Sequence, residues 1–193
     1  GNLPRHTPYD TGLFILNDSM ELLWSKQVAL PIREDLFRVE DFVLDDMGNA
    51  YVVAKHYLQR EQERIKGRPG FEYIVYGYRN QGEEKVDYIL NLKSFFLSDL
   101  RLEISPQGDL VCAGFYSKKG TSRVAGTFYF TVDPATKGIR QKSLYEFDLN
   151  FLTQHLNDRQ REKVKRKIAA GKDTGLEKFA IRELVPREDG GTM

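Results

Sequence analysis

The sequence has little of the chemistry by which an enzyme site is usually recognised. It holds a single cysteine, Cys112, so no disulfide can form within the chain. Cys112 stands in an apolar stretch, where we expect a small buried side chain rather than a nucleophile. The histidines His6, His56 and His155 are far apart and lack the spacing of metal ligands. We therefore predict no catalytic residue, no cofactor and no metal site from the sequence.

Long apolar runs are missing as well. None approaches the ~20 residues that a membrane-spanning helix requires, and no signal peptide is recognisable. The net charge of +1 gives no general reason to expect a nucleic-acid partner. With 40% hydrophobic and 12% aromatic residues, however, the chain has enough apolar material for a packed core.

A group of short polar side chains also fails to indicate a site. Asp45, Asp46 and Asn49 lie close together, but they lack the alternating acidic positions and closing glutamate of an EF-hand loop. Asp and Asn next to Gly48 are typical of a tight hairpin turn. We interpret the group as a turn rather than a calcium site.

The sequence does contain a repeat. Residues 41–54 read as a strand, a glycine turn and a second strand, and residues 101–114 follow the same order. An aromatic strand, a polar turn and one more strand come after each of them. The pattern predicts two up-and-down four-stranded antiparallel units, at residues 39–92 and 99–147.

The two ends of the chain fit the same pattern in part. We predict the last two strands of a preceding unit over residues 11–30, and a first strand over 179–185 that opens another unit in 179–193. About three units do not close a ring, since propellers typically have 4–8 blades. We expect the ring to be completed by further chain or by other copies, with self-association through open strand edges.

The turn and strand Asp46-Met47-Gly48-Asn49-Ala50-Tyr51-Val52 is similar to those of bacterial six-bladed and related β-propeller repeats. The resemblance extends over most of residues 11–147. It implies an all-β, propeller-like fold and favours a secreted, periplasmic or surface location. A smaller antiparallel sandwich or barrel is the alternative architecture.

One segment does not belong to the repeat. Residues 153–172 contain a stretch of good helix formers, and we predict one helix near 154–171 that begins at Thr153 or Asp158 and ends at Gly171. Basic side chains dominate it, with seven against two acidic residues in 155–172. The candidate interaction residues are those of this helix together with the loop of the second unit: Arg159, Arg161, Lys163, Lys165, Arg166, Lys167, Lys118, Lys119 and Arg123.

Three functions stay open on this basis. The first is a non-catalytic binding or scaffold propeller that engages a protein or a glycan. The second is a propeller-type hydrolase, lyase or lactonase whose axial site is only partly present. The third is an acidic partner docked on the basic helix, which is otherwise a solvated helix face. Aromatic residues do not interleave with the charges, and this does not favour nucleic acid.

Overall fold

The computed structural model describes residues 10–29, 33–59, 64–65, 68–90, 92, 95–118, 121, 123–172, 174–176 and 179–189. Of the described residues, 53% are in strands and 12% in helices, and the two large sheets are antiparallel and four-stranded. The prediction of a mostly β fold built from four-stranded antiparallel sheets is confirmed. The chain divides into two compact units, Gly1–Glu63 with Gly70–Leu90, and Arg64–Pro69 with Asn91–Met193.

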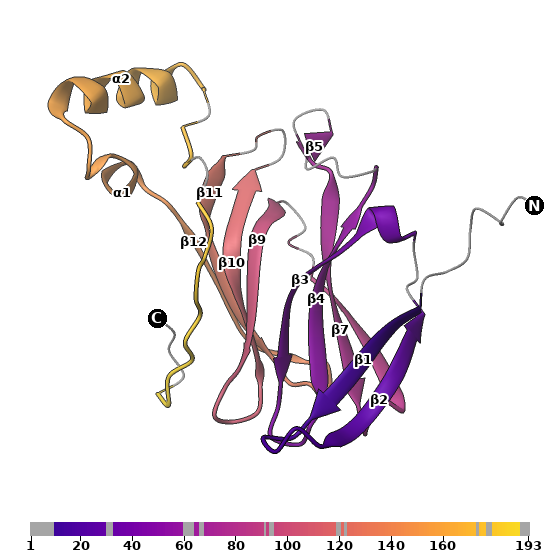
Figure 1. Ribbon diagram of the computed structural model, residues 1–193. Coiled ribbons are helices and arrows are strands. Elements are labelled where there is room, and N and C mark those ends of the chain that lie inside the picture. Colours follow the sequence, from indigo (N-terminus) through magenta and orange to yellow (C-terminus); the bar gives the residue numbers. More distant parts are fainter. Residues whose placement is uncertain are drawn as a thin grey trace, which may run out of the picture. The chain divides into compact units, whose positions relative to one another are not determined.

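The first unit contains a four-stranded sheet and a hairpin. The sheet has the order β3-β4-β7-β8, so neighbours along the chain are neighbours in space. The hairpin joins β1 and β2 (Figure 1). The elements are β1 (Asp10–Leu16), β2 (Leu22–Ala29), the 3-10 turn η1 (Glu34–Leu36), β3 (Phe37–Leu44), β4 (Ala50–Tyr57), β7 (Phe71–Arg79) and β8 (Glu84–Ile89).

The hairpin packs on one face of this sheet. Ile15 and Trp24 of the hairpin are buried in one cluster with Ala50, Ala54, Tyr76 and Tyr78 of the sheet. The Trp24 indole N–H donates a hydrogen bond to the carbonyl of Gly48, 3.0 Å away. A buried indole usually finds such an acceptor, and this one fixes the hairpin to the β3–β4 turn.

The other face of the hairpin carries exposed apolar side chains. Phe14 is 66% exposed and Leu23 53%, because alternate residues of a strand point to opposite faces. Within the described residues, β1 pairs with β2 alone. Both observations are consistent with association through an open strand edge, which stays a prediction.

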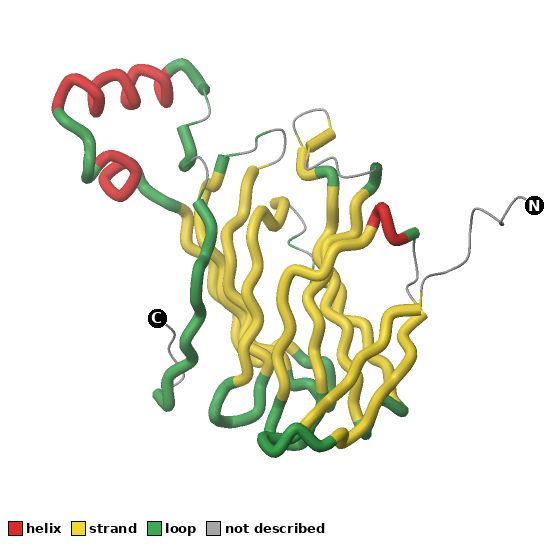
Figure 2. Tube along the Cα trace, viewed as in Figure 1, coloured by secondary structure: helices red, strands yellow, loops and turns green. Residues whose placement is uncertain are grey.

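The second unit repeats the sheet and adds two helices. Its sheet has the order β12-β11-β10-β9, and Figure 2 shows both helices in red after the last strand, joined by a green loop. The elements are β5 (Arg64–Ile65), β6 (Arg68–Pro69), β9 (Phe95–Ile104), β10 (Leu110–Lys118), β11 (Val124–Val132), β12 (Ile139–Glu146), α1 (Leu149–Thr153) and α2 (Asp158–Ala169).

An extended segment, rather than a new strand, lies on one face of this second sheet. Residues 179–185, which we expected to be the first strand of another unit, are extended but do not form a strand. The Ile181 N–H donates to the Asp99 carboxylate at 2.5 Å, and the Arg101 side chain donates to the Ile181 carbonyl at 3.0 Å. These side chains satisfy backbone groups that a neighbouring strand would otherwise pair. Leu184 is buried in a cluster with Val111 and Ala113.

Candidate interaction surface

The helical insertion consists of two helices instead of the single one expected. Asp148 caps α1, since its carboxylate accepts a hydrogen bond from the Phe151 N–H at 2.7 Å. Thr153 does not cap the second helix. It is the last residue of α1, where its hydroxyl donates to the Leu149 carbonyl. The turn that follows separates α1 from α2.

The cap of α2 is Asn157, one residue before the predicted Asp158. The Asn157 side chain accepts from the Gln160 N–H at 2.9 Å, and the Gln160 side chain accepts from the Asn157 N–H at 3.1 Å. This reciprocal pair is a capping box. At the other end Gly171 adopts φ +67°, which is the left-handed conformation that commonly ends a helix. The signal in the sequence is Asn157-Asp158-Arg159-Gln160, which places an amide three positions after the cap residue.

The basic residues of α2 divide between two sides of the helix. At 100° per residue, Arg159, Lys163, Arg166 and Lys167 lie within one arc. All four are exposed, and none lies within ion-pair distance of an acidic side chain in the described part of the chain. We call these four residues the basic face. It is a continuous band of positive charge about two turns long.

The remaining basic residues of the helix lie beside acidic ones. Arg161 is 3.7 Å from Asp158, and Lys165 is 2.8 Å from Glu162. The hydrogen bond and charge of Lys165, followed by the charge of Arg166, lower the pKa of Glu162. Such exposed pairs contribute little to stability, but they reduce the positive charge on this side of the helix.

The insertion begins and ends at neighbouring residues of β11. The Phe147 N–H donates to the Ala125 carbonyl at 2.9 Å, just before α1. After α2, Leu176 exchanges two backbone hydrogen bonds of 2.9 Å with Val124. Gly175 permits this close approach, because a Cβ there would lie 2.4 Å from the Val124 carbonyl oxygen. Both ends of the insertion are therefore hydrogen-bonded to neighbouring residues of β11, and we call this place the root of the insertion.

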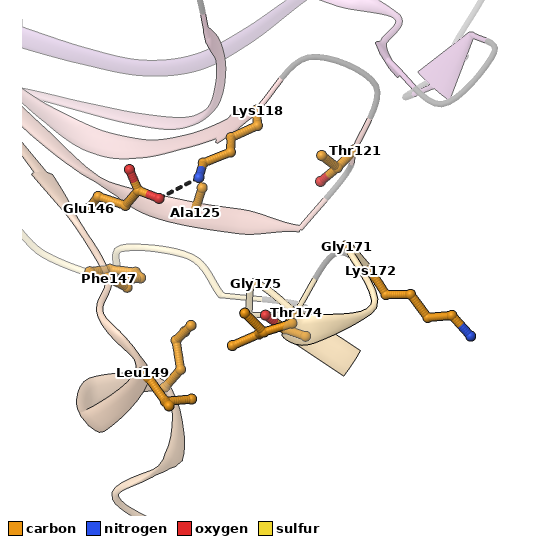
Figure 3. Close-up of a pocket in the computed structure, with 12 residues that line it drawn as sticks. Lys118, Thr121, Ala125, Glu146, Phe147, Leu149, Gly171, Lys172, Thr174 and Gly175 are labelled. Atoms are coloured by element: carbon orange, nitrogen blue, oxygen red, sulfur yellow. Dashed lines mark hydrogen bonds and ion pairs between the residues drawn. The ribbon is translucent and has the colours of Figure 1, made fainter. Parts of the chain in front are cut away.

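A pocket of about 460 Å³ lies at this root (Figure 3). The ends of β10 and β12, the helix α1 and the end of α2 supply its walls. Its lining residues are Lys118, Thr121, Ala125, Glu146, Phe147, Leu149, Leu152, Ile168, Gly171, Lys172, Thr174 and Gly175. Its size falls within the range of about 300–1,000 Å³ typical of ligand pockets.

The structure brings only part of the predicted loop cluster to this pocket. Lys118 lines it and pairs with Glu146 across the sheet. Arg123 is half-buried just before β11, and its Cβ lies near Gly175. Lys119 lies outside the described residues. Sequence reasoning missed Glu146, Phe147 and Ile168 as pocket residues.

Polar side chains elsewhere are engaged in structural contacts. The Asp45 carboxylate accepts hydrogen bonds from the N–H groups of Met47 and Asn49 and from the Asn49 side-chain amide, as the turn interpretation expects. The His56 Nε2 lies 2.6 Å from the Tyr76 hydroxyl, and burial lowers the pKa of His56. Burial raises the pKa of Cys112. The described residues contain no group of three potential metal ligands.

The comparisons give no family for the chain. No family model, no curated protein and no solved structure matches it. Among the described residues, no helix is long and apolar enough to cross a membrane. The candidate functional features are the basic face and the pocket at the root of the insertion.

Proposed function

We propose that the chain is part of a non-catalytic, β-propeller-like binding module that docks an acidic protein on α2. The propeller-like arrangement is supported by two sheets with the same meander order. It is also supported by equivalent hairpin turns at Gly48 and Gly108, with φ of +77° and +81°. The second strands β4 and β10 bury residues on both faces, as a blade between two neighbours requires.

The basic face is the observation that carries the docking proposal. Four exposed basic side chains follow one side of α2, without acidic neighbours within ion-pair distance among the described residues. No residue of α2 is buried, so packing in the core does not explain the helix. Complementary charge gives specificity and fast association. An acidic protein segment fits a band about 12 Å long, given the 1.5 Å rise per helical residue.

The test is a charge reversal with a matched control. In the first variant, Lys163→Glu and Lys167→Glu reverse half of the basic face. In the control, Lys142→Glu and Arg182→Glu make the same change in net charge at two other exposed positions of the second unit. Binding of a fluorescein-labelled polyglutamate peptide is measured by anisotropy at low salt. We expect the first variant to lose about tenfold in affinity and the control to change much less.

Three results would contradict the proposal. Equal losses in both variants would mean attraction to net charge alone. Binding that persists unchanged at high salt would exclude an electrostatic contact. Binding of a heparin fragment without binding of polyglutamate would assign the basic face to an anionic glycan instead of a protein.

A further inference from the structure

The pocket is continuous with the helix that carries the basic face. Ile168 of α2 lines the pocket and is 42% exposed. It lies one residue after Lys167, on a different side of the same turn. Ile168 lies about 100° around the helix from Lys167 and farther from the other basic-face residues. A partner that fills the pocket and also contacts the basic face must therefore pass around α2 near its C-terminal end.

The floor of the pocket is apolar. Phe147 is buried, and its ring stacks on Phe151 with a centroid distance of 4.4 Å. Leu149, Leu152 and Ile168 also line the cavity. Interface hot spots are typically aromatic side chains that fill such desolvated pockets, and a ring placed beside Phe147 gains an aromatic contact.

The rim of the pocket is charged. Lys118 and Glu146 form an ion pair there with 51% and 58% of their side chains exposed. Figure 3 shows the Lys118 amine directed at Glu146. Leu149 lies on the other side of the set of lining residues from this ion pair. A carboxylate that arrives at the rim competes with Glu146 for Lys118. Removing the Glu146 charge would then strengthen the binding of an acidic ligand.

We propose that this pocket binds one large aromatic side chain of the acidic partner, while neighbouring carboxylates of the partner contact Lys118 and the basic face. The inference rests on the proposed function and specifies the partner's chemistry: an acidic segment with an aromatic anchor. The volume of about 460 Å³ accommodates such a side chain together with part of its backbone.

Two labelled peptides test the anchor. Both are short glutamate peptides, one with a central tryptophan and the other with serine at that position. We expect the tryptophan peptide to bind the full chain about tenfold more tightly, as a filled hot-spot pocket implies. Ile168→Ala should remove most of that difference and leave the affinity for the serine peptide unchanged. A circular-dichroism spectrum checks that α2 remains folded.

A pair of amide variants tests the rim. Glu146→Gln and Glu183→Gln each remove one negative charge, but Glu183 is an exposed residue that lies outside both the pocket lining and α2. We expect Glu146→Gln to strengthen tryptophan-peptide binding by a few-fold more than Glu183→Gln does. Equal effects would mean that the carboxylates of the ligand do not contact Lys118.

The results separate this inference from the proposed function. Equal affinities for the two peptides, both weakened by Lys163→Glu with Lys167→Glu, would overturn the anchor and leave the docking function standing. No binding of either peptide would overturn both. A preference for tryptophan that survives Ile168→Ala would place the anchor elsewhere and contradict the inference.

Discussion

Each of the two four-stranded sheets has one face covered by an element of its own unit, but the two coverings differ. In the first unit a hydrogen-bonded hairpin supplies Ile15 and Trp24 to the cluster on β4 and β7. In the second unit a single extended segment supplies Leu184. Its backbone is held by Asp99 and Arg101 instead of a neighbouring strand. One face of a repeated sheet can therefore be covered either by a hairpin of two paired strands or by a single extended segment that side chains of the sheet hold in place.

The largest effect is expected where the hairpin is fixed to the first sheet. Trp24→Ala removes a buried indole and the hydrogen bond to the Gly48 carbonyl. Loss of a buried aromatic side chain costs about 3–5 kcal/mol of the free energy of unfolding. Urea denaturation monitored by circular dichroism measures it. A loss below about 1 kcal/mol would mean that the hairpin hardly stabilises the first unit.

The covering of the second sheet should be weaker. Leu184→Ala removes one side chain that is 7% exposed and packs against Val111, Ala113 and Tyr129. We expect a loss of about 2–3 kcal/mol, toward the lower end for buried leucine. Hydrogen exchange should show the loss of protection centred on the Ile181 amide. A loss as large as that of Trp24→Ala would remove the difference between the two coverings.

Two glycine turns provide a smaller, matched contrast. Gly82 and Gly108 both have φ of +81°, but a Cβ on Gly82 would lie 3.0 Å from the Trp24 ring, whereas Gly108 has no atom within 4 Å. Alanine at either position costs about 1–2 kcal/mol for the left-handed backbone. We expect Gly82→Ala to cost more, because it also disturbs the hairpin. Equal costs by thermal denaturation would show that the Trp24 ring adjusts freely.

The smallest effect is expected at the β11–β12 turn, and it depends on pH. The Arg140 hydrogen bond, together with N–H donors of Ala135 and Thr136, lowers the pKa of Asp133 from its ordinary value of 3.8. A carboxylate with a lowered pKa stabilises the fold above that ordinary value and loses this contribution as the pH falls below it. Asp133→Asn should therefore be less stable than the parent chain at pH 7, and the difference should shrink below about pH 4. A difference that stays constant with pH would refute this assignment.

The repeat could be predicted from the sequence because its signals are local. Glycine turns, alternating apolar residues and aromatic strands specify each hairpin within a few residues. The segment 179–185 is likewise rich in apolar residues, but its backbone hydrogen-bonds to the side chains of Asp99 and Arg101, about 80 residues away. No local pattern distinguishes an extended segment held in this way from a paired strand.

The candidate site was predictable only in part, for the same reason. The charge of α2 is evident in the sequence, and the helix lies close to its expected bounds. The cap was misplaced by one residue, because Asn157 and Asp158 are both good caps and only the amide of Gln160 selects between them. The pocket combines three separate stretches of chain. They meet through the Val124–Leu176 pairing, which no spacing in the sequence indicates.

The closed root of the insertion has a consequence for how this region can change over evolutionary time. Since Phe147 and Leu176 pair with adjacent residues of β11, the chain leaves the sheet and returns to it at nearly the same place. A segment joined in this way can be lengthened, shortened or exchanged while the strands beneath it keep their register. The insertion is thus suited to changes of length and sequence that leave the sheet intact, and to grafting of a foreign loop by a protein engineer.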